Sequence, residues 1–317
     1  MAELRPLITV VIAVHNLEKF IGETIESVLA QTLSRFELIV VVDSSTDATA
    51  AIARSYADDP RVKVLEVSAR AVGLARNTGL ERGSAPYVVF LDGDDLLTQT
   101  ALEKFSGAFE ETPSAVAVVA GHHKIDEQGH YLPGEDAGSR PPFPSSDALW
   151  HLLERNNITN GGTICIRSDV ARAVGGYDKA LREREDWDFW CRLACRGSFV
   201  SLGREATLLY RQRQFNTHSR PFAAPPPAIG KVFALPQVRE RFSPRELRAM
   251  HRTTLIDSFW ASARTALYRG ERLNFSLFFL VGMLRYPDSL VRGFLLRFLL
   301  RQVNSRLRPQ AVASRGP

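Results

Sequence analysis

The chain has little cysteine: three residues in 317, at positions 165, 191 and 195. So small and odd a number does not build the disulfide framework of a secreted domain, so we expect a reducing compartment, the cytoplasm. Cys191 and Cys195 lie four residues apart in an apolar helical pattern, with no histidine at zinc-site spacing. We therefore predict that they are small core residues and not zinc ligands.

Long hydrophobic runs are also missing. The longest mostly apolar stretches, 7–14 and 277–284, have eight residues each, whereas a membrane-spanning helix needs about 18. His15 and Asn16 follow the first stretch at once, which indicates a buried strand and not a signal peptide. No Gly-rich phosphate loop follows this strand. That absence excludes a dehydrogenase with a G-x-G-x-x-G turn and disfavours a nucleotidyltransferase.

Charge is nearly balanced but unevenly placed. The 40 basic and 35 acidic residues give a net charge of +5, and 45% of residues are hydrophobic, as in ordinary globular domains. Residues 264–317 hold ten Arg and no Lys against two acidic residues, a net charge of +8, which leaves −3 on residues 1–263. A slightly acidic body therefore carries a basic tail.

The first hundred residues alternate between apolar strands and amphipathic helices. We expect strands over 7–14, 36–42, 62–67 and 87–91, and helices over 17–31, 47–56 and 72–82. Ser45 or Thr46 is the expected N-cap of the second helix. Apolar strands separated by helices predict a parallel sheet covered on both faces. Ligands of such sheets bind beyond the carboxyl ends of the strands.

The rest of the chain has a looser pattern. We expect helices over 101–111, 146–154 and 186–196, strands over 115–120, 163–167 and 206–211, and a long loop over 126–146. Three prolines at 225–227 predict a stiff linker, because proline cannot continue a helix or a sheet ladder. Residues 228–317 are expected to be helical.

The strongest local motif is Phe-Leu-Asp-Gly-Asp-Asp at 90–95. Three carboxylates directly after an apolar strand suit Mg²⁺ or Mn²⁺, which prefer oxygen ligands. In an extended segment Asp92 and Asp94 point the same way, so one can hold a hydroxyl while the other binds a metal. The alternative is a polar turn with an Asp that caps the next helix.

Four motifs in register resemble the family 2 glycosyltransferases. They are Ile8–Asn16 with Glu18, Thr24–Thr32, Glu37–Asp47, and Gly73–Leu80 followed by Tyr87–Asp95. The resemblance covers about residues 7–215. It implies an inverting enzyme with a GT-A fold, an α/β fold with a Rossmann-like, mostly parallel sheet. It also implies a donor half over 1–113 and an acceptor half over 114–221. Beyond the resemblance, we expect a proline linker and a helical, basic appendage over 222–317.

The resemblance implies a donor site for a nucleotide-diphosphate sugar, with a UDP-sugar favoured. The backbone of Ala13 and Val14 would face the base, and Glu18 would lie at the pocket edge. Asp43 matches the acid that hydrogen-bonds the base, and Asp92 the acid on the ribose side. For Asp43, an Asx-turn or cap at the strand end is the alternative.

Some positions depart from the family pattern or stay open. Val42, Ser44 and His15 replace common family residues, which leaves the base preference undecided. Arg76 and Asn77 are read either as a cation and an amide that face the donor or as a surface arginine and a packing asparagine. Arg70 is an alternative cation on the donor side.

Metal ligands are implied at Asp94, with Asp95 beside it. His218, in a later polar loop, is either a third ligand, a phosphate donor or an exposed side chain. His122 and His123 receive no role.

The acceptor side is implied by Gly175-Gly176-Tyr177 and the acid pair Glu185-Asp186. Asp186 matches the catalytic base, since a carboxylate must take the proton of the attacking sugar hydroxyl. Glu185 is the second candidate for this role. Without the family match, an N-cap would be the simpler role for Asp186. Trp187 is a core residue that is also considered for stacking on an acceptor sugar.

The basic tail favours an anionic membrane surface. In its second apolar segment Arg297, Arg301 and Arg308 share one helical face, as in helices that bind membrane interfaces. We therefore expect contact through 273–308, peripherally on the inner face of the cell membrane. Packing on the catalytic domain or on a second subunit, as a homo-oligomer, is the alternative. No motif indicates nucleic-acid binding.

The function predicted from these observations is metal-dependent sugar transfer to a glycan or a lipid-linked acceptor, in cell-surface polysaccharide or glycolipid synthesis. A catalytically silent subunit that binds nucleotide sugars or assists assembly is the alternative.

Overall fold

A computed structural model of the chain describes residues 5–132, 147–154, 156, 158–213 and 226–268, together with 276, 280 and 281. Packing divides the chain into two units, one of residues 1–216 and 226–251 and one of 217–225 and 252–317. The first unit holds the sheet and most of the predicted site residues. Of the second, the structure describes mainly the later part of helix α10 (Pro244–Tyr268).

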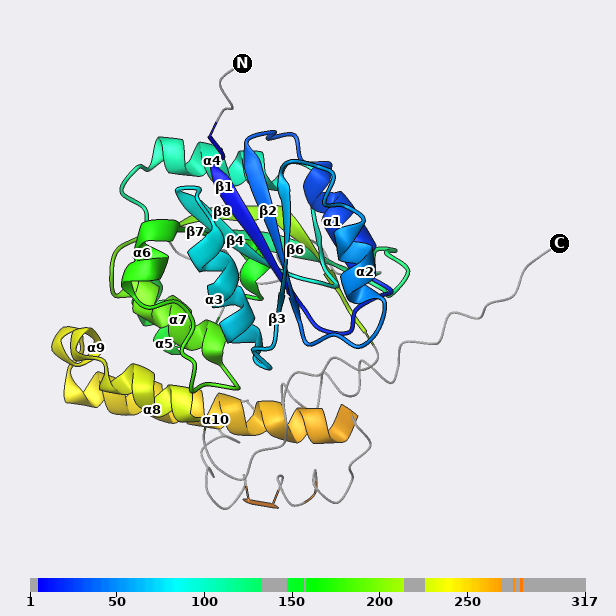
Figure 1. Cartoon of the computed structure of the whole chain (residues 1–317). Helices are drawn as coiled ribbons and strands as arrows, with labels where there is room; N and C mark the ends of the chain where they lie inside the picture. Colours follow the sequence, from blue (N-terminus) through cyan, green and yellow to red (C-terminus); the bar gives the residue numbers. More distant parts are fainter. Residues whose placement is uncertain are drawn as a thin grey trace. The chain divides into compact units, whose positions relative to one another are not determined.

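The strands described in the first unit form one mixed sheet with the order β3-β2-β1-β4-β7-β6-β8-β5 (Figure 1). They are β1 (Ile8–Val14), β2 (Phe36–Asp43), β3 (Val62–Val67), β4 (Tyr87–Asp92), β5 (Leu96–Leu97), β6 (Ala117–Ile125), β7 (Ile164–Arg167) and β8 (Phe199–Arg211). Strands β3, β2, β1 and β4 run parallel, and β7 is antiparallel to both of its neighbours. The predicted α/β fold with a mostly parallel sheet is confirmed.

Helices cover both faces of the sheet. The first unit contains α1 (Ile21–Leu29), α2 (Thr49–Arg54), α3 (Val72–Arg82), α4 (Ala101–Glu111), α5 (Ala148–Glu154), α6 (Ser168–Ala173) and α7 (Glu185–Ala194), with a short 3-10 turn η1 (Gly161–Thr163). Helices α8 (Pro227–Ala234) and α9 (Pro236–Arg241) follow, and α8 packs on α7.

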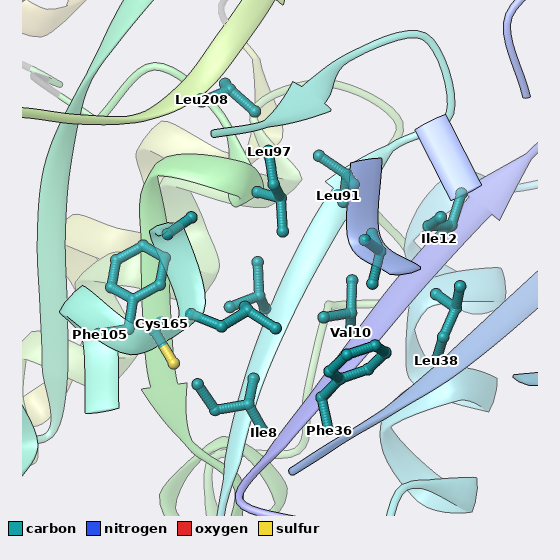
Figure 2. Packing of buried hydrophobic residues seen from close by; sticks show 14 of the residues in the cluster. Ile8, Val10, Ile12, Phe36, Leu38, Leu91, Leu97, Phe105, Cys165 and Leu208 are labelled. Carbon is teal, nitrogen blue, oxygen red and sulfur yellow. The ribbon is translucent and has the colours of Figure 1, made fainter. Parts of the chain in front are cut away.

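Successive side chains of β1 point to opposite faces of the sheet, because a strand repeats every two residues. Ile8, Val10 and Ile12 join the core that α1, α2 and α4 cover, where Phe105 also lies (Figure 2). Val11 points the other way, toward α3. There Gly79 permits close packing, because a Cβ at this position would lie 2.2 Å from a methyl carbon of Val11.

The predicted cap of the second helix is wrong. Helix α2 begins at Thr49, its N-cap is Ala48, and the cap residue makes no side-chain cap bond. Ser45 instead accepts a hydrogen bond from the backbone of Asn16, and the carboxylate of Glu18 accepts one from Ala48. The loop after β2 is therefore bound to the loop after β1, at the edge where a ligand was predicted.

Several elements are longer than predicted, and three were not predicted. Strand β6 includes His122 and His123, and β8 begins at Phe199. Strand β5, the turn η1 and helix α6 were not expected. Pro227 starts α8, in the first helical turn where proline is tolerated. The linker residues 223–225 and the tail from 269 lie outside the described residues, apart from 276, 280 and 281.

The cysteines are free, and Cys165 and Cys191 are buried while Cys195 is half-buried. In the part of the chain that the structure describes, no helix combines the length and apolar character that a membrane crossing requires.

Candidate active site

The carboxyl ends of three neighbouring strands meet at one edge of the sheet. Ala13 in β1 lies in register with Val41 of β2 on one side and with Asp92 of β4 on the other. Asp43, the last residue of β2, and Asp92, the last of β4, therefore flank the end of β1. The structure brings Ala13, Val14, Asp43 and Asp92 together, as the sequence predicts.

Arg76 connects this edge to the start of α7. Its Nη2 donates to Asp92 Oδ1 and its Nη1 to Asp186 Oδ1, both at 2.7 Å. Glu185 Oε1 lies 3.8 Å from Nη1. Arg76 is 5% exposed, so the surface role considered for it is wrong. Carboxylates from two distant segments share one buried cation.

The charge of Arg76 depends on these carboxylates. Burial acts against the cation, but the charges of Asp186, Asp92 and Glu185 outweigh it, so the pKa of Arg76 is raised well above its usual value. The guanidinium also lies over the ring of Tyr177, 5.1 Å from the ring centroid. The hydroxyl of Tyr177 is buried and has no hydrogen-bond partner among the described residues.

Asp186 lies in the first turn of α7 but does not cap it. The N-cap is Arg184, which has a left-handed backbone and makes no side-chain cap bond. Asp186 instead accepts a hydrogen bond from Arg76, so its side chain is directed to the sheet edge. Trp187 is 2% exposed and donates to the carbonyl of Leu152. It is a core residue, and stacking on an acceptor sugar is not available to it in this conformation.

The side chain of Asp43 accepts hydrogen bonds from the loop before α3 as well as from its own turn. Its Oδ1 accepts from the backbone N–H of Arg70 at 3.0 Å and its Oδ2 from that of Ala71 at 3.1 Å. The side chain of Arg70 is exposed. Asn77 is a packing residue, because its amide both donates to and accepts from the backbone of Tyr177, each at 2.8 Å.

Strained backbone surrounds this edge. Four non-glycine residues have positive φ in the described chain: Asn16 (50°), Ser44 (54°), Arg70 (51°) and Arg184 (58°). Three follow β1, β2 and β3, and the fourth precedes Glu185 and Asp186. Left-handed backbone at non-glycine residues is uncommon and concentrates at functional sites, where the surrounding structure maintains it.

The loop after β4 separates its acids into two environments. Asp94 Oδ2 lies 2.7 Å from Arg213 Nε. Asp95 is 1% exposed; its Oδ2 accepts from Asn160 Nδ2 at 2.5 Å and its Oδ1 from the backbone N–H of Arg211 at 2.8 Å. Burial, followed by the charges of Asp92 and Asp94, raises the pKa of Asp95 well above its ordinary value.

These contacts change the metal set expected from the sequence. Both carboxylate oxygens of Asp95 bind protein donors, so Asp95 holds the loop and does not face a ligand. Within the described residues, no group of three or more His, Cys, Asp and Glu side chains is arranged to hold a metal ion. His218 lies outside the described residues. Glu18 is exposed at the edge and holds the next loop.

Sequence reasoning missed Asn160 and Arg213. The signal for the first was Asn160-Gly161-Gly162, since paired glycines indicate close backbone approach. A Cβ on Gly161 would lie 2.3 Å from the carbonyl oxygen of Phe90, so the turn packs directly on β4. Arg213 lies two residues beyond the predicted end of a strand, where no pattern indicated its partner.

The fold and the acidic sheet edge define a class, the GT-A type of glycosyltransferase fold. TarS from S. aureus, in a structure of residues 1–349 in complex with UDP-GlcNAc, shares this fold with a TM-score of 0.60 at 17% identity. The alignment covers 90% of this chain and 92% of that one. The same TarS segment in a second structure gives a TM-score of 0.61 at 18% identity.

Sequence comparison gives the family. The profile of "Glycosyl transferase family 2" matches residues 9–174, slightly more than half of the chain. The uncharacterized glycosyltransferase EpsJ of Bacillus subtilis is 30% identical over 211 residues, which cover 65% of this chain and 61% of EpsJ. Chondroitin synthase of Escherichia coli is 28% identical over 205 residues, which cover 63% of this chain and 28% of that protein.

The chain belongs to glycosyl transferase family 2, and the family predicted from its motifs is confirmed. It matches 61% of the length of EpsJ and 28% of that of chondroitin synthase.

Proposed function

We propose that the chain transfers a sugar from a nucleotide-diphosphate sugar to an acceptor hydroxyl, with inversion at the anomeric carbon. The observation that carries this proposal is the buried contact of Arg76 with both Asp92 and Asp186. It joins the end of β4, where family 2 enzymes bind the donor, to the start of α7, where they hold the base. In a single displacement the base takes the proton of the hydroxyl that attacks the donor, so the base and the donor site must be adjacent.

The donor site consists of the strand ends. Ala13 and Val14 face the base with Asp43 beside them, Glu18 lies at the edge, and Asp92 takes the ribose side. The TarS structure with UDP-GlcNAc supports a UDP-sugar as the donor. The name of chondroitin synthase supports a glycan acceptor and a role in polysaccharide synthesis.

Asp186 is the base, with Glu185 as the second candidate. A sugar hydroxyl is a weak nucleophile, so Asp186 accepts its proton as the hydroxyl oxygen bonds to the anomeric carbon. The bond from that carbon to the diphosphate oxygen breaks, and its electron pair leaves with the diphosphate. Arg76 donates to Asp186 and thereby orients the carboxylate.

The residues of the loop after β4 fit a divalent metal that arrives with the donor. Mg²⁺ usually takes one or two protein carboxylates together with phosphate oxygens of the substrate, and does not need a complete protein cage. Asp94, with Asp92 beside it, would hold Mn²⁺ or Mg²⁺, which neutralises a leaving diphosphate when bound.

Transfer assays with purified variants test the roles. Asp186→Asn and Asp94→Ala should each lower kcat at least 100-fold, whereas Asp169→Asn, on the exposed start of α6, should change it less than twofold. Full activity of Asp186→Asn together with loss in Glu185→Gln would reverse the two assignments. Full activity in both would refute this site.

A donor screen separates the enzyme from a catalytically silent subunit. Thermal shifts with UDP-, GDP- and dTDP-sugars, with and without Mn²⁺, identify the base, because a bound donor stabilises the native state. Turnover of the bound donor supports the enzyme, and binding without turnover on any acceptor supports the silent subunit. Membrane contact through 273–308 and a peripheral cytoplasmic location stay predictions.

A further inference from the structure

A buried clamp holds the loop that carries Asp92 and Asp94. Asp95 lies at the centre of the clamp, with one carboxylate oxygen on the amide of Asn160 and the other on the backbone of Arg211. Asp95 and Asn160 are 1% and 6% exposed. The three residues come from the loop after β4, the turn η1 and the end of β8.

The turn that presents Asn160 has little freedom. Asn160 Oδ1 accepts from the backbone of Gly162 at 3.0 Å, and its carbonyl accepts from the hydroxyl of Thr163 at 2.8 Å. Gly161 admits no side chain, because a Cβ there would lie 2.3 Å from the carbonyl oxygen of Phe90, and a Cβ on Gly162 would lie 2.6 Å from a methyl carbon of Leu208, which would have to shift. The amide of Asn160 is therefore fixed before any ligand binds.

Arg211 fixes the same loop from the opposite side. Its Nε donates to the carbonyl of Asp94 at 2.8 Å, and its Nη2 donates to Glu23 at 2.7 Å. The Arg211 side chain is fully buried. The carbonyl of Asp94 and the carboxylate of Asp95 are thereby held by protein donors, while the side chains of Asp92 and Asp94 contact Arg76 and Arg213.

We propose that Asn160 is a positioning residue for the donor: through Asp95 it fixes the orientation of the Asp92 and Asp94 carboxylates toward the ribose and the diphosphate. The inference rests on the proposed function. It gives Asp95 a different role from the metal ligand expected from the sequence. Hydrogen bonds to a buried carboxylate are strong, and a displacement of about 1 Å at such a site lowers kcat/KM up to about 100-fold.

The first test is the steady-state kinetics of Asn160→Ala. We expect the KM for the donor to rise about tenfold, with kcat and the KM for the acceptor within about threefold of the wild type. A merely structural role would lower the amount of folded protein and leave both KM values unchanged, which would overturn the proposal.

The second test exchanges the two partners. The double variant Asp95→Asn/Asn160→Asp retains an amide-to-carboxylate bond with donor and acceptor reversed, an oxygen for the Arg211 N–H and an oxygen for Gly162. We expect the single variant Asp95→Asn to raise the donor KM and the double variant to restore it to within about threefold. If position 95 must supply a metal-binding carboxylate, the double variant stays impaired, and the positioning role is refuted.

Two controls keep the outcomes separate. Thr9→Val removes an equally buried hydrogen bond to a carboxylate, that of Glu37, near the opposite edge of the sheet, so it should destabilise the protein without changing the donor KM. If Asn160→Ala does not fold, the donor KM values of Asp95→Asn and of the double variant test the proposal. Loss of activity in Asp186→Asn with wild-type kinetics in every clamp variant refutes positioning alone, whereas the absence of sugar transfer by the wild-type protein refutes the proposed function itself.

Discussion

Replacement of Arg76 by methionine should destabilise the fold, whatever the reaction. Arg76 donates two hydrogen bonds of 2.7 Å to carboxylates, and its side chain is 6% exposed. Methionine keeps an unbranched apolar side chain but removes the cation, so Asp92 and Asp186 face one another across a space with no positive charge between them.

The size of the effect follows from the two lost bonds. Hydrogen bonds to charged groups contribute about 1.5–3 kcal/mol each. The side chains of Asp92 and Asp186 are 23% and 27% exposed and can recruit water, so we take the lower value, about 3 kcal/mol for the pair. For a domain of this size that loss lowers Tm by roughly 6–12 °C.

Thermal unfolding of four proteins measures this loss of stability: the wild type, Arg76→Met, Asp186→Asn and the double variant. Asparagine at 186 removes one of the two negative charges that Arg76 contacts, so the double variant should be more stable than the sum of the single losses predicts, by about 1 kcal/mol. A Tm for Arg76→Met within about 2 °C of the wild type, or strictly additive losses, would refute the bridging role.

Three further outcomes follow from the packing. Gly161→Ala should lower the yield of folded protein sharply because of its clash with Phe90. Gly107 has no atom within 4 Å of an added Cβ and a helical backbone, so Gly107→Ala should raise the free energy of unfolding by about 0.5–1 kcal/mol. Equal Tm values for the two variants would contradict this. Burial raises the pKa of Glu37, but hydrogen bonds from Ser84, Lys63 and Thr9 outweigh it and lower the pKa below 4.5. The stability that results is complete above pH 4.5 and is lost as the pH falls through the folded-state value, so acid titration should show a smaller loss in Glu37→Gln. Ellman's reagent should label native protein slowly and at Cys195 alone, where burial raises the pKa to about 11, and at all three cysteines in denaturant; fast labelling of the native protein would contradict the packing.

The sequence alone predicted the first half of the fold well because its signals are local. Strands buried on both faces are continuous apolar runs, and the predicted bounds of Val62–Val67, Val72–Arg82 and Ala101–Glu111 agree with the structure. Prediction was weaker where polar residues occupy a strand. His122 and His123 interrupt the apolar pattern of β6, so the strand was predicted to end before them.

The site required knowledge of contacts between distant residues. The family motifs indicated Asp92 and Asp186, but nothing in the sequence shows that one arginine, 16 residues from the first and 110 from the second, binds both. Asp94 and Asp95 are adjacent residues of the same type, so the sequence does not distinguish their roles. Only the fold distinguishes them, because it places Asn160 and the backbone of Arg211 on the second and Arg213 on the first.

The left-handed residues around the sheet edge set a limit on how this protein can be improved. Glycine adopts a positive φ without steric cost, so replacement of Ser44, Arg70 or Arg184 by glycine relieves local strain of about 1 kcal/mol at each position, but glycine also loses about 0.5–1 kcal/mol more backbone entropy on folding. The free energy of unfolding therefore gains little from such replacements. The loops that hold Asp43 and Asp186 would lose rigidity, so turnover would fall without a compensating gain in heat resistance.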